Sequence, residues 1–409
     1  MIRRSTQPGR GGWRDRGPTN VARPRSRAAR SVSVAVVVSC FVGVGLLNTR
    51  PAAARPTVIV YAAAGEETSC GISSSGGLYC WGRNQFGQIG DGTTPNRLSP
   101  TAVFGLASNV TAVFPGRHTC AVVAGALVCW GKNSNGQLGD GTTTNRLTPT
   151  PVAGLGASVS DADSSAGHTC AISAGAAKCW GANASGQLGD GTTTDRLLPV
   201  AVSGLSSGVT AITTGDASSC AIRLGAAKCW GANSYGQLGD GSTTSRSTPV
   251  QVVGLTTKVT GIDSDVSHTC AVVLSAAMCW GDNGFGQLGR PASLGPNPTP
   301  AAISGLSSGV AAIDVGSGHS CAIALSTAKC WGRSSDGEVG VGTFDEVWSP
   351  ASVVFPPGLT SGATRISAGS SSTCATTLPS LVSYCWGRNN YGQVGDNTTI
   401  VRALPTFVG

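Results

Sequence analysis

Cysteines are the residues of this chain whose spacing most directly predicts chemistry. Apart from Cys40, fourteen cysteines form seven local pairs, most with eight residues between the partners. Zinc sites usually need ligands two to four residues apart with histidine nearby, so this spacing favours disulfides. Folding Cys120–Cys129 about Ala124-Gly125 places the two cysteines opposite each other on a hairpin, about 4.5 Å apart between Cα atoms, within disulfide reach. The predicted pairs are Cys70–Cys80, Cys120–Cys129, Cys170–Cys179, Cys220–Cys229, Cys270–Cys279, Cys321–Cys330 and Cys374–Cys385.

The four histidines occupy one position relative to these pairs, two residues before the first cysteine. They are His118, His168, His268 and His319. Thr68, Ser218 and Ser372 hold the same place in the other units. Side chains that interchange as His, Thr and Ser suit a structural hydrogen bond at the start of a strand. A metal site would need ligands that converge on one point, so we expect no metal site here.

Aspartate and arginine recur six residues apart in five of the units. The pairs are Asp91 with Arg97, Asp140 with Arg146, Asp190 with Arg196, Asp240 with Arg246, and Asp396 with Arg402. The fifth unit has Arg290 and Pro296 at these places, and the sixth has Val341 and Val347. Joint loss of both members predicts that the two side chains pair, in a geometry that could be bidentate. A carboxylate neutralised in this way is a poor general base, which favours a structural role.

Aromatic side chains suggest a surface for a partner. Phe86, Tyr235, Phe285 and Tyr391 share one position in an Asn-x-x-Gly turn, where they either pack on the neighbouring unit or contact a partner. The irregular fifth and sixth units add Arg290, Phe344 and Trp348. Together these seven residues form the candidate partner surface.

Catalysis would require a constellation of side chains outside the repeat phase. The chain has no unique Ser-His-Asp set, no phosphate-binding glycine loop, and no carboxylate pair outside the repeat phase that is typical of catalysis. We therefore predict a protein that is not an enzyme, with no catalytic residues and no cofactor.

A repeat of about 50 residues must position all of these side chains. Seven Cys-Trp-Gly triplets recur at spacings of 49 to 55 residues, each followed by a block like Asn133–Gly141 and then by Thr/Ser-rich residues and proline. Their tryptophans are Trp81, Trp130, Trp180, Trp230, Trp280, Trp331 and Trp386. Even units of short strands are typical of propeller blades, and a closed ring removes long exposed sheet edges.

Within the second unit the residues predict four extended segments. Residues 111–114, 120–123 and 127–130 are short and apolar, and a fourth extended piece opens at Pro151-Val152. Glycine and proline punctuate the whole region, and no apolar run has helical periodicity. The predicted fold is therefore all-β: a single seven-bladed β-propeller over residues 55–409, with a hairpin disulfide in each repeat.

The positive charge lies in the first 54 residues. This segment holds ten arginines and one acid, whereas the remaining residues hold 18 basic and 19 acidic side chains. The propeller region thus has a net charge of −1, which disfavours nucleic acid as a partner. Residues 1–54 are interpreted as a signal peptide, with the apolar run Ser31–Leu47 and the small residues Ala52–Ala54 as a cleavage site, or as an uncleaved anchor.

This leader and the cysteine pairs together predict an extracellular or cell-envelope protein. Buried thiols in a cytosolic chain are the alternative interpretation of the same cysteines.

Several motifs are similar to a known repeat. His-Thr-Cys-Ala (118–121), Cys-Trp-Gly (129–131), Asn-x-x-Gly-Gln-Leu-Gly (133–139) and Asp-Gly-Thr (140–142) resemble the regulator of chromosome condensation repeat, here in an exported, bacterial-type member. The resemblance implies a seven-bladed propeller, commonly closed by strands from both termini in one blade. Residues 57–61 and 403–408 would be those closing strands. It also implies guanine-nucleotide exchange on a small GTPase as the namesake activity.

The expected function is that of a monomeric, secreted or cell-surface binding scaffold for another protein or a cell-wall polymer. Inhibition of an extracellular enzyme and, by family analogy, nucleotide exchange are the alternatives. Membrane contact is expected only through an uncleaved N-terminal segment.

Overall fold

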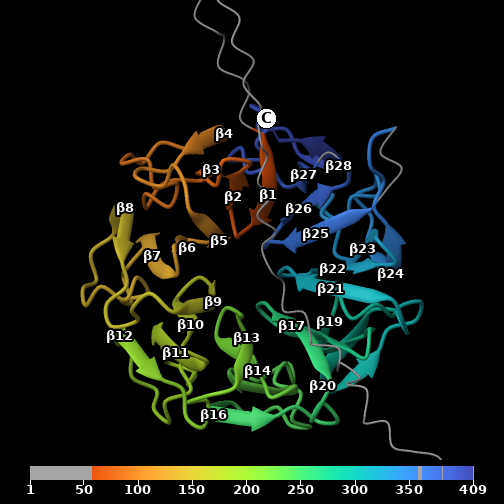
Figure 1. The fold of residues 1–409 in the computed structure, drawn as a ribbon. Helices are drawn as coiled ribbons and strands as arrows, with labels where there is room; N and C mark the ends of the chain where they lie inside the picture. The colour runs from red at the N-terminus through yellow and green to blue at the C-terminus, as the bar shows by residue number, and fades with distance from the viewer. Residues whose placement is uncertain (1–57, 358–361, 380, 409) are drawn as a thin grey trace, which may run out of the picture. The chain divides into compact units, whose positions relative to one another are not determined.

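Antiparallel four-stranded sheets make up the whole described fold. The computed structural model describes residues 58–357, 362–379 and 381–408, and the leader with Cys40 lies outside them. Within these residues, twenty-eight strands form seven sheets arranged as blades around a central axis (Figure 1). The prediction of a seven-bladed β-propeller is confirmed. The described residues contain no helix long and apolar enough to cross a membrane.

Each blade uses four consecutive strands, paired in chain order from the innermost to the outermost. Blade 1 contains β1 (Ile59–Ala64), β2 (Thr68–Ser73), β3 (Leu78–Gly82) and β4 (Arg97–Ala102). Blade 2 contains β5 (Val110–Phe114), β6 (His118–Val123), β7 (Ala126–Gly131) and β8 (Arg146–Pro151). Blade 3 contains β9 (Val159–Ser164), β10 (His168–Ser173), β11 (Ala176–Gly181) and β12 (Arg196–Ala201).

The remaining four blades follow the same order. Blade 4 contains β13 (Val209–Thr214), β14 (Ser218–Arg223), β15 (Ala226–Gly231) and β16 (Arg246–Gln251). Blade 5 contains β17 (Val259–Ser264), β18 (His268–Val273), β19 (Ala276–Asn283) and β20 (Ser293–Ala302). Blade 6 contains β21 (Val310–Val315), β22 (His319–Ala324), β23 (Thr327–Gly332) and β24 (Val347–Ser352). Blade 7 contains β25 (Ala363–Ala368), β26 (Ser372–Thr377), β27 (Val382–Gly387) and β28 (Arg402–Phe407).

The fourth strand of each blade differs from the sequence-based expectation. In blade 2 this strand ends at Pro151, where we expected an extended piece to begin. Prolines sit in these strands because each fourth strand is the outer edge of its sheet, where a missing backbone N–H breaks no ladder hydrogen bond. The strand is therefore built from the Thr/Ser-rich and Pro-containing residues that follow each Asn133–Gly141-like block.

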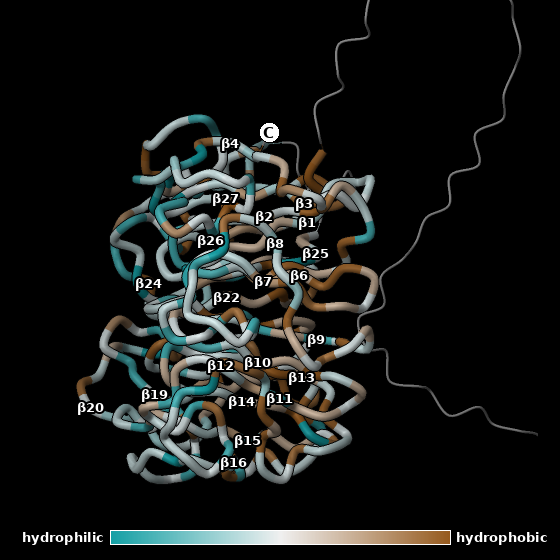
Figure 2. Tube along the Cα trace, turned by 90° about the vertical axis from the view of Figure 1, so that its left-hand side faces the viewer, coloured by the Kyte–Doolittle hydropathy of each residue, from teal (hydrophilic) through white to brown (hydrophobic). Residues whose placement is uncertain are grey.

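The ring has two different faces. The loop face carries the short loops between first and second strands and the long loops between third and fourth strands. The hairpin face carries the turns between second and third strands and the connections from each fourth strand to the next blade. β1 runs from the hairpin face to the loop face, because Ala64 pairs with Ser69 across the short loop. Figure 2 shows the ring from the side, with the brown start of β1 near its top.

Ring closure does not use a blade shared by both termini. β1 is the innermost strand of blade 1 and β28 is the outermost strand of blade 7, so the two strands lie at opposite radial positions and cannot pair. The prediction that residues 57–61 and 403–408 close the ring together is wrong for this reason. Blades 7 and 1 meet side by side instead, and the Trp81 indole Nε1 donates to the Gln393 carbonyl at 3.0 Å.

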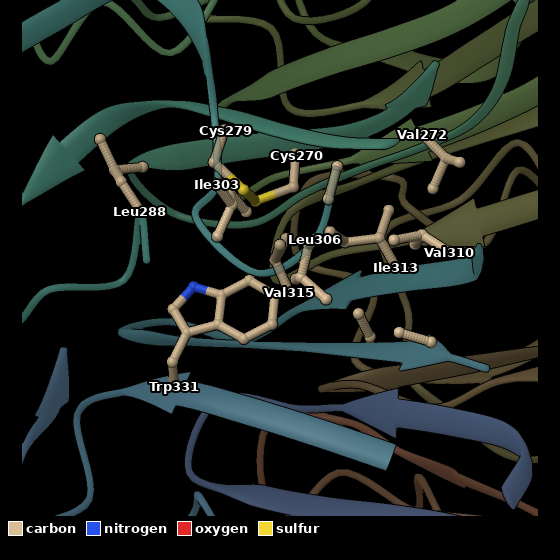
Figure 3. Close-up of a cluster of buried hydrophobic side chains, with 13 residues drawn as sticks. Cys270, Val272, Cys279, Leu288, Ile303, Leu306, Val310, Ile313, Val315 and Trp331 are labelled. Atoms are coloured by element: carbon tan, nitrogen blue, oxygen red, sulfur yellow. A yellow bond between two sulfur atoms is a disulfide. The ribbon is translucent and has the colours of Figure 1, made fainter. Parts of the chain in front are cut away.

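Seven apolar clusters fill the seams between neighbouring blades. In each seam, the fully buried tryptophan of one blade packs beside the disulfide of the preceding blade. Figure 3 shows the Trp331 ring of blade 6 pointing toward Cys270 and Cys279 of blade 5. The Trp331 Nε1 also donates to the Gln287 carbonyl of blade 5 at 2.9 Å. The Cys-Trp-Gly triplet thus builds a hairpin and a seam at the same time.

Candidate functional site

All fourteen cysteines of the propeller are paired as predicted. Each disulfide joins the second and third strands of one blade, and the partners are nine to eleven residues apart in sequence. Cys120 and Cys129 face each other in the hairpin register, with Cα atoms 4.1 Å apart. The bridges fix the geometry of every blade independently of the others.

The histidines make hydrogen bonds across the seams rather than gathering at one point. His118 Nε2 lies 2.6 Å from Thr169 Oγ1 of blade 3, and that hydroxyl donates to the Gln137 carbonyl at 2.8 Å. The hydroxyl therefore accepts from the imidazole, which places the histidine proton on Nε2. Burial lowers the pKa of His118 to about 3. The corresponding bonds of the other histidines reach Ser219, Ser320 and Thr373 of the following blades.

The five Asp–Arg pairs are present in the long loops of the loop face. In blade 3, Arg196 Nε and Nη2 both contact Asp190 Oδ2, at 2.9 and 2.8 Å. The other oxygen, Oδ1, accepts from the Thr192 amide and hydroxyl, so the pair is not the two-oxygen bidentate geometry that we considered. Burial alone would raise the pKa of Asp190, but these donors outweigh it and hold the pKa below its usual range. The equivalent pairs join Arg97 to Asp91, Arg146 to Asp140, Arg246 to Asp240 and Arg402 to Asp396.

A cavity of about 420 Å³ lies on the ring axis and reaches the short loops of the loop face. Seven acidic side chains and one arginine line it. The acids are Glu66, Asp161, Asp163, Asp216, Asp263, Asp265 and Asp314, and the arginine is Arg117. Arg117 is already paired with Glu66, its Nε lying 2.5 Å from Glu66 Oε2.

One equivalent position in each first strand determines whether that strand presents a polar or an apolar side chain near the cavity. The position pairs with the first cysteine of its blade and carries Ala63, Phe114, Asp163, Thr213, Asp263, Asp314 and Ser367. A polar side chain here accepts an N–H from the next blade. Asp163 accepts from the Thr214 amide at 2.7 Å, and Asp263 accepts from the Val315 amide at 2.7 Å.

The apolar residues at this position follow from the same rule. For Ala63, the residue at the donor place in the next blade is Pro115, which has no N–H to satisfy. For Phe114, the residue at that place is Ser164, whose amide already donates to Asp163 Oδ1 at 2.9 Å. The acids therefore have a structural task, but one N–H bond does not neutralise a buried carboxyl group.

Five buried aspartates of the cavity are unusually weak acids. Burial, reinforced by neighbouring carboxyls, raises the pKa of Asp263 to about 7 and of Asp265 to about 8. Burial likewise raises the pKa of Asp161 to about 7, and it raises those of Asp163 and Asp314. A positive group placed among them would favour their ionised forms.

Thr213 joins two of these acids. Its Oγ1 lies 2.6 Å from Asp263 Oδ1 and 3.2 Å from Asp163 Oδ2. One hydroxyl has a single proton to donate, so the two carboxylates cannot both receive it. Nearby, the Ser264 hydroxyl is buried, lines the cavity, and has no hydrogen-bond partner among the described residues.

Comparison with known proteins identifies the family of the repeat. The Regulator of chromosome condensation (RCC1) repeat matches residues 75–123, 124–172, 178–222, 229–272 and 279–323, and a second form of it matches residues 59–88. The chain belongs to the RCC1 repeat family. The matched segments cover more than half of the sequence, and blades 6 and 7 continue the same repeat in the structure.

Solved structures share the RCC1 fold at low sequence identity. Human WBSCR16 has a TM-score of 0.71 at 20% identity, with 81% of this chain and 93% of that chain covered. Yeast RCC1 (Prp20), solved bound to Kap60, has a TM-score of 0.70 at 20% identity, with 93% and 91% covered. Prp20p from Saccharomyces cerevisiae, in a study of its binding to Gsp1p and histones, has a TM-score of 0.69 at 20% identity, with 86% and 87% covered. A search of curated protein sequences found no significant match.

The predicted partner surface of this RCC1 repeat protein lies on the long loops of the loop face. Three of its aromatic rings lie beneath a cation of the next blade: Tyr391 beneath Arg83 at 4.9 Å, Phe86 beneath Lys132 at 5.9 Å, and Phe285 beneath Arg333 at 5.9 Å. These rings thus brace neighbouring blades while remaining partly exposed. Tyr235, in blade 4, is exposed.

The irregular RCC1 repeats of blades 5 and 6 present Arg290, Phe344 and Trp348. Phe344 is exposed, and Arg290 is partly buried with its Nη2 3.2 Å from Asn297 Oδ1. Trp348 packs over Gly286 of blade 5, yet 48% of its surface remains exposed. It fills a contact between blades and keeps an aromatic edge exposed.

The acids of the central cavity were not predicted from the sequence. Only carboxylates outside the repeat phase were considered candidates, whereas Asp163, Asp263 and Asp314 lie within the repeat phase, seven residues before a first cysteine. The alternation of Asp161 and Asp163 in one strand was a usable signal, because residues two apart share a side of a strand. In the described residues, no three His, Cys, Asp or Glu side chains are grouped to hold a metal ion.

Proposed function

We propose that this protein is an exported binding scaffold whose loop face recognises another protein, with a basic side chain of that partner entering the acidic cavity. The observation that supports the proposal best is the charge of the cavity, where seven acids face one arginine that is already paired. A lysine or arginine there would donate charge-assisted hydrogen bonds to the buried aspartates, whose ionised forms it would favour. A neutral wall polymer would not use these charges.

Export is supported by two independent features. Seven disulfides, one in each blade, fit an oxidising compartment and do not fit the reducing cytosol. The first 54 residues have the arginine-rich, apolar and small-residue order of a targeting segment. The cysteines and the leader are separate parts of the sequence, so their agreement strengthens the proposal.

The test compares capture of proteins from culture supernatant and envelope extract by two variants. The triple variant Asp263→Asn, Asp265→Asn, Asp314→Asn keeps the shape of the side chains and an oxygen acceptor while removing the acid. Asp345→Asn with Glu346→Gln is the matched control, because both residues are exposed on the loop face outside the cavity.

We expect capture by wild type and control to be equal, to fall at least about tenfold in the triple variant, and to be competed by a tri-lysine peptide. Affinity for tri-lysine should rise from pH 6 to pH 8.5, because the cavity acids ionise with pKa values of about 7 to 8. Capture of a neutral polysaccharide, or equal capture by the triple variant, would contradict the proposal.

A further inference from the structure

Leucines stand at strained, exposed positions on the hairpin face. Leu224, Leu274 and Leu325 open the turns between second and third strands in blades 4, 5 and 6, with φ of 50°, 52° and 50°. This left-handed region favours glycine, asparagine or aspartate and disfavours a bulky side chain. The three side chains are 66–81% exposed, so neither burial nor backbone preference explains leucine at these turns.

Other apolar side chains extend this exposed surface. Leu381 has the same φ of 50° in blade 7, and Phe104, Val253 and Val354 are exposed in connections between blades. Here the apolar side chains protrude singly from separate tips around the ring.

The charges of the hairpin face all have one sign. Its turns and blade connections contain no aspartate or glutamate, and all nineteen acids of the propeller region lie elsewhere. Four of the five lysines that follow the leader lie at this face: Lys178, Lys228, Lys258 and Lys329. The Lys178 Nζ donates to the Gly154 carbonyl of a blade connection at 3.2 Å, which holds its charge at the face.

The chain also enters the propeller from this face. Val58, the first described residue, precedes β1 at its hairpin-face end and is exposed. In the sequence, only ten residues separate Val58 from the apolar run Ser31–Leu47. An N-terminal segment that is retained in a membrane would therefore lead into the hairpin face.

We infer that the hairpin face binds the surface of a membrane containing anionic lipids. Single leucines would insert at the boundary between headgroups and acyl chains, and the surrounding lysines would contact the headgroups. A protein partner would be expected to offer pockets for clustered anchors and to tolerate acids at the rim, whereas this face has dispersed apolar tips and no acid. The inference is independent of partner binding at the loop face, and it adds a membrane contact beyond the N-terminal segment.

Amine labelling of the full-length protein tests the inference, with vesicles of phosphatidylcholine and phosphatidylglycerol. Lys132 is an internal control, because it lies beside Phe86 on the loop face. We expect vesicles to reduce labelling of Lys178, Lys228, Lys258 and Lys329 and to leave Lys132 unchanged. Pure phosphatidylcholine vesicles should give much weaker protection, by roughly fivefold for each lysine that contacts the lipid surface.

A leucine variant separates this face from the leader. Leu224→Asn, Leu274→Asn, Leu325→Asn together should fold normally, because asparagine suits the left-handed turn position. Leu198→Asn, Leu294→Asn, Leu404→Asn is the matched control, since these leucines are exposed on outer strands. We expect the turn variant to lose protection of the four lysines and to require at least about tenfold more lipid, with the control unchanged.

Three results would overturn the inference. Equal lysine protection in the turn variant and wild type would mean that other residues bind the vesicles. Protection of Lys132 together with the other lysines would show that no single face is used. Protection of the four lysines by a soluble protein from envelope extract, with none by vesicles, would assign the face to a protein partner instead.

Discussion

Buried histidines and buried acids of this ring respond to pH in opposite directions. His118, His168, His268 and His319 have pKa values lowered to about 3 by burial, so they stay neutral in the seams. The cavity acids are shifted upward instead, with pKa values of about 7 for Asp161 and Asp263 and about 8 for Asp265. Both shifts arise because the interior disfavours the charged form of each group.

These shifts predict an unusual dependence of stability on pH. A raised acid pKa stabilises the fold below about pH 4, and this stabilisation is lost as pH rises through the folded values of 7 to 8. A lowered histidine pKa stabilises the fold above about pH 6.5, and this is lost as pH falls toward 3. The two effects oppose each other between about pH 4 and 6.5, so we expect the free energy of unfolding to change little there and to fall from pH 6.5 to 8.5.

Denaturant unfolding at pH 5, 6.5 and 8.5 measures this curve. In the variant Asp263→Asn, Asp265→Asn, Asp314→Asn, the fall above pH 6.5 should become shallower. A free energy of unfolding that rises steadily from pH 6.5 to 8.5 in the wild type would contradict the burial of these acids as protonated groups.

The coupling energy of one ion pair in a long loop can be measured for Asp190 and Arg196. Asp190 is nearly buried, whereas the Arg196 side chain is 36% exposed, so solvent screens part of the attraction. In a double-mutant cycle with Asp190→Ala and Arg196→Ala, we expect a coupling energy of about 1 kcal/mol. Thr192→Val in the same background removes the hydroxyl that holds Asp190 Oδ1 and should lower the coupling. Strictly additive single and double variants would show that the two side chains do not interact in solution.

At the scale of elements, the hairpin formed by the second and third strands is the unit that specifies the blade. Its disulfide, its tryptophan and its histidine or hydroxyl residue all lie within about a dozen residues, and each makes a contact that belongs to the seam. This local concentration explains why the hairpin could be predicted from sequence. The outer strands could not, because their edge position tolerates proline and polar residues that resemble a linker.

Removing one disulfide measures how much a single hairpin bridge contributes to the free energy of unfolding. Cys270→Ala with Cys279→Ala opens a loop of nine-residue separation and should cost about 2–3 kcal/mol of unfolding free energy, with a further loss from packing against Trp331.

The number of free thiols in the denatured, non-reduced protein also reports the fate of the leader. We expect none if the leader is removed and one, Cys40, if it is retained. Several free thiols per chain would contradict the structure.

At the scale of the molecule, the sequence predicted the ring but not its closure or its cavity. Seven equal units predicted seven blades, because a repeat that cannot bury its own faces must stack on copies of itself. Closure depends on which strand of a blade comes first in the sequence, and the repeat pattern does not reveal this. The structure shows it, because β1 pairs with β2 inside blade 1. The cavity acids were missed because each occupies a regular repeat position, and only the radial arrangement brings them together.

The contiguity of each blade has a consequence for how the cysteines find their partners. Every bridge joins cysteines that are consecutive in the sequence of the propeller, and no bridge links two blades. A chain that emerges unfolded from its N-terminal end therefore presents the two partners of a pair before any competing cysteine follows. Oxidation in order of emergence yields the native set directly, so no bridge has to be broken and remade when the last blade arrives and the circle is completed.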